Sequence, residues 1–122
     1  MSSPPDQQMV VLARGGLDRE DAALAVRIAL ALPLEGAAVQ LVLVDSASLL
    51  ALADPPDLAP WGGGLLRELE ALLDDDETTV LVETESLALT GLDDQPLRPG
   101  VEVATRAEVT SICGLARACL VI

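Results

Sequence analysis

The polar residues with the greatest chemical potential directly follow a short apolar run. Val80–Val82 leads into Glu83, Thr84, Glu85 and Ser86, a cluster that offers carboxylates and hydroxyls for acid-base or nucleophilic chemistry. In a sheet of parallel strands, ligands and reactive groups collect at the carboxyl ends of the strands. Glu83 and Ser86 are therefore the first candidates for a functional site at such an edge.

Two further acids belong to this candidate loop and contact site. Glu85 lies two residues beyond Glu83, and Asp45 closes the second apolar run of the chain. We expect Glu83 and Glu85 to face different ways, which argues against a paired acid-base site of the glycosidase kind. The candidate site thus consists of Asp45, Glu83, Glu85 and Ser86, in a contact role rather than a catalytic one.

Missing residue types exclude whole classes of reaction. The chain has no histidine, and all seven of its basic residues are arginine. It therefore has no Ser-His-Asp or Cys-His triad, no imidazole metal ligand, no Walker A lysine and no Schiff-base lysine. The acidic run Asp74 to Glu77 predicts a solvated loop. We expect no catalytic residue, no metal site and no cofactor.

Cys113 and Cys119 are the only thiols. Cys119 falls inside the last expected strand, where we predict a buried side chain that acts as a small hydrophobe. Cys113 falls near the end of the last expected helix, where the helix dipole raises the pKa of a thiol. Neither residue has the pattern of an activated sulfur carrier, and a disulfide between them is not expected in a cytoplasmic protein.

The elements that must position these residues alternate between strand and helix. Apolar runs predict strands over residues 9–13, 38–44, 79–82, 101–104 and 118–122. Helical spacing predicts helices over 22–32, 48–52, 65–73, 87–89 and 106–115, the last with a capping box of Thr105 and Glu108. Five strands with helical connections predict a doubly wound, three-layer α/β/α fold with a five-stranded parallel sheet, of flavodoxin-like type. The order of the strands stays open.

The chain is short enough for one core. Its 122 residues, of which 51% are hydrophobic, predict a single domain over residues 9–122 behind a disordered lead of residues 1–8. Residues 53–64 carry three prolines and three glycines and predict an irregular loop. This loop holds Trp61, the only aromatic residue, which is either a plug for the core or an anchor at a subunit interface. We predict an oligomer with Trp61 at or near the contact.

Charge and hydropathy exclude some kinds of binding partner. A net charge of -13 repels a phosphate backbone, so we expect no direct binding of nucleic acid. The acids either keep an apolar domain in solution or complement a basic partner. No apolar run approaches the roughly 20 residues of a membrane span, and the first residues lack the features of a signal peptide. We therefore expect a cytoplasmic protein without membrane contact.

The segment after the third strand also carries a family resemblance. Its pattern V-x-x-x-S-L-x-x-x-G-L is formed by Val82, Ser86, Leu87, Gly91 and Leu92. It resembles the segment found in the TusC/DsrF branch of the DsrE-type sulfur-relay proteins, and chain length and element order fit along nearly the whole sequence. The resemblance implies a DsrE-type fold. It also implies that Glu83 stands at the position of the relay cysteine, whereas Thr90 replaces the arginine that commonly precedes the Gly-Leu pair.

The resemblance implies a role in an assembly. In DsrEFH/TusBCD-like hetero-oligomers, three related subunits pass persulfide sulfur toward tRNA 2-thiouridine synthesis or toward sulfur oxidation. With Glu83 in place of the cysteine, the expected role is that of a structural, non-catalytic subunit. Two alternatives remain open. One is a homo-oligomeric small-molecule-binding module, with the Arg14-Gly15-Gly16 turn and the Glu83 loop lining its pocket. The other is a persulfide carrier that uses Cys113.

Overall fold

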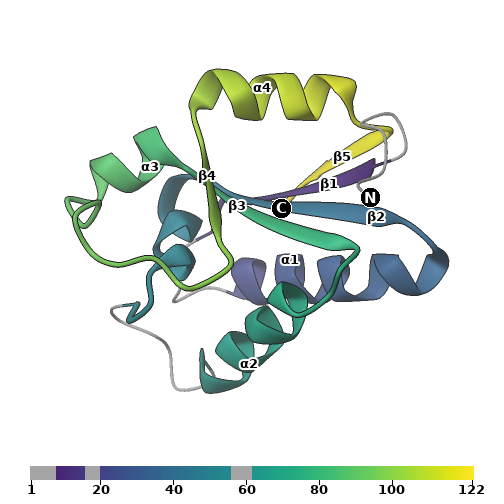
Figure 1. Ribbon diagram of the computed structural model, residues 1–122, viewed down its shortest axis with the longest axis horizontal. Coiled ribbons are helices and arrows are strands. Elements are labelled where there is room, and N and C mark those ends of the chain that lie inside the picture. The colour runs from purple at the N-terminus through teal and green to yellow at the C-terminus, as the bar shows by residue number, and fades with distance from the viewer. Residues whose placement is uncertain (1–7, 16–19, 56–61) are drawn as a thin grey trace.

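The computed structural model describes residues 8–15, 20–55 and 62–122, and strands and helices alternate along this part of the chain (Figure 1). The strands are β1 (Gln8–Ala13), β2 (Ala38–Leu43), β3 (Thr78–Glu83), β4 (Glu102–Ala104) and β5 (Ala118–Val121). The α-helices are α1 (Glu20–Ala31), α2 (Gly62–Leu73), α3 (Thr84–Leu89) and α4 (Arg106–Leu115), and the 3-10 helices are η2 (Leu32–Glu35) and η3 (Asp45–Ala51).

All five strands run parallel in the order β4-β3-β2-β1-β5. The chain steps in one direction from β1 to β4, and it then returns to place β5 on the other side of β1. Because crossovers between parallel strands are right-handed, the reversal puts α4 on the opposite face from α1 and α2, as Figure 1 shows. The predicted three-layer α/β/α fold with a five-stranded parallel sheet is confirmed.

The two faces of the sheet are covered unequally. The α1/α2 face holds the larger core, which contains the fully buried Leu41, Leu43, Leu69 and Leu72. The α4 face has one helix and a smaller set of buried side chains: Val10, Val42, Val44, Leu81, Ala104 and Val109. Successive residues of a strand face opposite sides, so each strand serves both cores. Much of the apolar surface near α4 and β5 consequently stays in contact with solvent.

The last strand differs most from expectation. Residues 118–122 were predicted to form a buried strand, but β5 is an edge strand that pairs only with β1. Leu120 is 41% exposed and Val121 is 58% exposed. The prediction was wrong because an apolar sequence shows that a strand prefers burial, whereas its place at the edge of the sheet depends on the strand order. The unpaired backbone groups of such an edge can pair with another chain.

Element boundaries differ in smaller ways. β1 begins at Gln8, the last residue of the expected lead, and α2 begins at Gly62, inside the stretch predicted to be irregular. α1 ends at Ala31, and Pro33 lies in the first turn of the 3-10 helix η2, where proline is tolerated. Trp61 lies outside the described residues. No helix in the described ranges is long and apolar enough to cross a membrane.

Two local predictions hold in detail. The capping box of α4 is present, with the Thr105 hydroxyl accepting from the Glu108 backbone and the Glu108 side chain accepting from the Thr105 backbone. After α3 the chain turns at Gly91, whose φ of 75° is readily available to glycine. These signals were local and strong, so α4 has its predicted bounds and α3 stops before Gly91.

Candidate functional site

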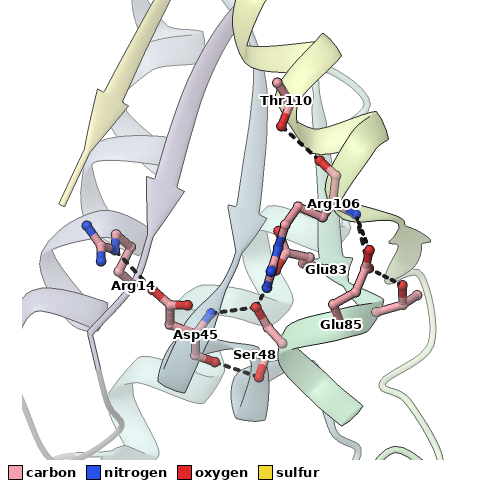
Figure 2. A network of polar contacts seen from close by, with 9 residues as sticks. Arg14, Asp45, Ser48, Glu83, Glu85, Arg106 and Thr110 are labelled. Atoms are coloured by element: carbon pink, nitrogen blue, oxygen red, sulfur yellow. Dashed lines mark hydrogen bonds and ion pairs between the residues drawn. The ribbon is translucent and has the colours of Figure 1, made fainter. Parts of the chain in front are cut away.

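Glu83 is the last residue of β3 and ends at the carboxyl edge of the sheet. Its side chain is only 6% exposed. The carboxylate oxygen Oε1 accepts hydrogen bonds from Ser86 Oγ at 2.6 Å and from Arg106 Nη2 at 3.0 Å and Nε at 3.3 Å. Figure 2 shows the guanidinium reaching from α4 to this carboxylate. A buried carboxylate is tolerated here because a cation and a hydroxyl donor compensate its charge.

Ser86 connects this carboxylate to the neighbouring strand. Its hydroxyl donates to Glu83 and accepts from the backbone N–H of Asp45 at 2.8 Å. Asp45 has a φ of 49°, a left-handed conformation that is uncommon for residues other than glycine. The Ser48 hydroxyl donates to the Asp45 carbonyl oxygen at 2.7 Å. Two serines therefore hold the turn that ends β2 in its unusual conformation.

Asp45 also carries an exposed ion pair. Arg14 Nε donates to Asp45 Oδ2 at 3.0 Å, and the two side chains are 60% and 51% exposed. Such a pair contributes little to stability, because water solvates both charges well. The structure thus places Arg14, at the end of β1, next to the turn after β2, and both lie at the same edge as Glu83 (Figure 2).

Glu85 lies in α3, and its side chain contacts the amino-terminal end of α4. Both of its carboxylate oxygens lie 3.0 Å from the Arg106 backbone nitrogen, and Thr84 Oγ1 donates to Oε1 at 2.7 Å. The hydrogen bond from Thr84, followed by that from the Arg106 backbone, lowers the pKa of Glu85. A negative charge at this position also interacts favourably with the positive end of the helix dipole of α4.

Arg106 contacts both acids at the end of β3 and the start of α3, and the sequence did not predict this contact. Its guanidinium binds Glu83 and its backbone N–H binds Glu85. The hydrogen bond and the charge of Glu83 raise the pKa of Arg106. The sequence shows that Arg106 begins the helix that follows the fourth strand. This position places Arg106 near Glu83 only if β4 lies beside β3, because the carboxyl ends of neighbouring parallel strands lie next to each other.

The structure brings Asp45, Glu83, Glu85 and Ser86 into one connected set of polar contacts. Glu83 and Glu85 were expected to face different ways, but both carboxylates contact Arg106. The reason is that the strand ends at Glu83 and Glu85 lies in the first turn of α3. Trp61, the predicted interface residue, lies outside the described residues.

The geometry favours a structural role for these side chains. A carboxylate lies within hydrogen-bond distance of the Ser86 hydroxyl, as a nucleophilic serine would need. However, Ser86 is 2% exposed, so its hydroxyl is shielded from a substrate in solution. Glu83 is similarly buried and already accepts bonds from Ser86 and Arg106. Among the described residues, no group of three or more potential metal ligands is arranged to hold a metal ion. The set can fix the loops at this edge and present Arg106 and Glu85 to solvent.

The cysteines lie away from this edge. Both are free; Cys113 is half-buried and Cys119 is exposed, so the prediction of a buried Cys119 is wrong. Burial raises the pKa of the Cys113 thiol to about 11, and hydrogen-bonding and charge effects of the neighbouring Cys119 act in the same direction. The predicted direction was correct, but the cause is burial and a second thiol rather than the helix dipole. A thiol with this pKa is a poor nucleophile at neutral pH.

A groove of about 260 Å³ lies on the α4 face, at the amino-terminal parts of β1 and β2. Its lining includes Gln8, Gln40, Ile112 and Leu115. The small-molecule alternative placed a pocket at the Arg14 turn and the Glu83 loop, and this groove lies at the other end of the strands. It therefore lends that alternative no support.

Comparison with known proteins identifies the fold. No protein-family model matches the chain, and no curated protein matches it. Among solved structures, the chain is similar to the ychN protein from E. coli, with a TM-score of 0.75 and 23% sequence identity. The likeness covers 95% of this chain and 99% of the other. Two chains that superpose over almost their whole lengths share one architecture, so the α/β fold derived above is that of a known structure.

Proposed function

We propose that this chain is a DsrE-like protein of the TusC/DsrF branch and serves as a non-catalytic subunit of a cytoplasmic sulfur-relay hetero-oligomer. Its role is to hold and position related subunits that pass persulfide sulfur, either toward tRNA thiolation or toward sulfur oxidation. The fold shared with the ychN protein supports the DsrE-like part of the proposal. The segment from Val82 to Leu92 supports the branch.

The observation that carries the non-catalytic role is the state of Glu83. In relay-active members of the resembled branch, a cysteine follows the third strand, and Glu83 occupies that position here. A carboxylate can neither accept sulfane sulfur nor leave as a thiolate. Moreover, Glu83 is buried and bound by Ser86 and Arg106. These contacts give the residue a structural use that does not depend on sulfur chemistry.

Exposed apolar side chains supply a surface for assembly. Leu115, Leu120 and Val121 are each more than 40% exposed, and they lie at the end of α4 and on the adjoining edge strand β5. Edge strands and uncovered apolar faces are usual sites of protein contact. We assign this surface to contacts with related DsrE-type subunits.

Charge favours different partners over a second copy of this chain. With a formal net charge of -13, two copies repel each other, whereas a subunit with a basic surface is attracted. Arg14 and Arg106 are largely exposed, but each already faces a carboxylate within this chain. The excess of acids is therefore available to a basic partner, and this supports a hetero-oligomer.

The proposal is tested with a chain that has no thiol. Cys113→Ser and Cys119→Ser are combined, the chain is co-expressed with the products of its neighbouring genes, and the purified complex is charged by a persulfide donor. A structural subunit predicts the same rate of sulfur transfer as with the wild-type chain. If the complex assembles but transfer stops, this chain carries sulfur and the proposal is wrong. If no complex forms with the wild-type chain, the assembly role is wrong.

A further inference from the structure

The two thiols are brought together by the return of the chain from α4 to β5. Cys113 lies in the last turn of α4 and Cys119 in β5, with a short connection between them. The connection is fixed at two points, since the backbone N–H of Ala116 donates to the Ile112 carbonyl at 3.1 Å and that of Arg117 to the Gln8 carbonyl at 2.9 Å. The positions of both thiols are therefore determined by regular structure.

The register of the sheet places both thiols on one face. Cys119 is the partner of Val10 in the parallel pairing of β5 with β1. Val10 belongs to the buried cluster beneath α4, and Cys113 packs against that same cluster. Partners in a parallel pair point to the same side of the sheet. Cys119 therefore points toward α4, where Cys113 lies.

The two thiols differ in accessibility. Cys119 is exposed, whereas Cys113 is half-buried beside it. An exposed thiol reacts first with a reagent from solution, and a neighbouring thiol can then resolve the product. An accessible thiol next to a shielded one favours an intramolecular disulfide, because the second thiol can displace the group that the first has acquired.

We propose that Cys113 and Cys119 form a modification site, at which a low-molecular-weight disulfide converts the dithiol into an intramolecular disulfide. In the first step the Cys119 thiolate attacks the small disulfide, and one small thiolate leaves. In the second step Cys113 gives its proton to solvent and its sulfur attacks Cys119, which expels the second small thiolate. One protein dithiol and one small disulfide become one protein disulfide and two small thiols, so atoms and electrons balance.

The pKa of Cys113 slows the second step. Burial raises this pKa to about 11, so only a small fraction of Cys113 is thiolate at neutral pH. Reduction by small thiols restores the dithiol, so the modification is reversible. The modification is independent of the proposed function, because it requires only this chain and a small disulfide.

The experiment uses the isolated chain and glutathione disulfide. The reduced wild-type protein is incubated at micromolar concentration, free thiols are blocked with N-ethylmaleimide, and intact mass and non-reducing electrophoresis are recorded. The expected product has lost two hydrogens, accepts no maleimide and migrates as a single chain, with one proteolytic fragment pair joined through Cys113 and Cys119. The Cys113→Ser variant should stop at the mixed disulfide with glutathione on Cys119.

Two results would overturn the proposal. One is a wild-type chain that keeps both thiols or stops at the mixed disulfide, because the thiols would then be too far apart or wrongly oriented to join. The other is disulfide formation only between two chains. The Cys119→Ser variant provides the matched control, and the proposal requires that its remaining Cys113 reacts many-fold more slowly with glutathione disulfide than Cys119 does in the Cys113→Ser variant.

Discussion

Replacing Ser86 by alanine tests the structural role of the buried carboxylate. The change removes a 2.6 Å hydrogen bond to Glu83 and the acceptor of the Asp45 N–H at 2.8 Å. Ser86 is 2% exposed and Glu83 5% exposed, so water cannot readily replace the lost donor. A hydrogen bond to a charged group contributes about 1.5–3 kcal/mol. Asp45 is exposed, so water can accept the hydrogen bond of its N–H, and the loss of this contact adds little to the change in the free energy of unfolding. We expect the free energy of unfolding to fall by about 2–3 kcal/mol.

The assay is urea denaturation followed by circular dichroism, with two controls. Ser111→Ala makes the same chemical change at an exposed position of α4 and should alter the free energy of unfolding by less than about 0.5 kcal/mol. Glu83→Gln removes the charge of the acceptor, so Ser86→Ala should cost clearly less in that background. If Ser86→Ala costs no more than Ser111→Ala, the buried hydrogen bond to Glu83 does not stabilise the fold. If Ser86→Ala costs as much in the Glu83→Gln background as in the wild type, the charge of Glu83 does not strengthen that bond.

Three further predictions concern the surface, the thiols and the acid response. Val121→Glu should abolish co-purification with partner subunits, whereas Leu24→Glu, a similarly exposed site on α1, should not; equal effects would refute the assigned surface. Maleimide should label Cys119 rapidly at neutral pH and Cys113 slowly, and labelling of Cys113 should accelerate as pH rises toward its pKa of about 11; fast labelling of both would contradict the burial. Hydrogen bonds lower the pKa of Glu85 from 4.5, so its contribution to stability is present above that pH and is lost as pH falls through the lower folded value; Glu85→Gln should flatten the acid side of the stability profile, and an unchanged profile would contradict this.

The sequence predicted the fold class because its signals were local. Apolar runs of strand length alternate with helical spacing, and this alternation alone implies a parallel sheet with helices on both faces. Helix α4 was predicted with its observed bounds, because the capping box of Thr105 and Glu108 fixes its start. The residues at the end of β3 were recognised as a site because they follow a strand of a parallel sheet.

Three features that were missed depend on which strands are neighbours. The role of Arg106 follows from β4 lying beside β3, and the exposure of Cys119 follows from β5 lying at the edge beyond β1. Composition and periodicity state that a segment prefers burial, but they do not state which segment covers it. The contact between Cys113 and Cys119 was missed for the same reason, since a helix end and a strand share a face only once the strand order is known.

We propose that Glu83 supports the structure and does not take part in sulfur transfer. The most direct measurement is the rate of sulfur transfer through the complex assembled with the Glu83→Gln chain, which keeps the shape of the side chain and removes its charge. We expect a complex of unchanged composition that transfers sulfur at the wild-type rate. A complex that assembles normally but no longer transfers sulfur would show that the Glu83 carboxylate participates in the chemistry and that its role is not structural alone.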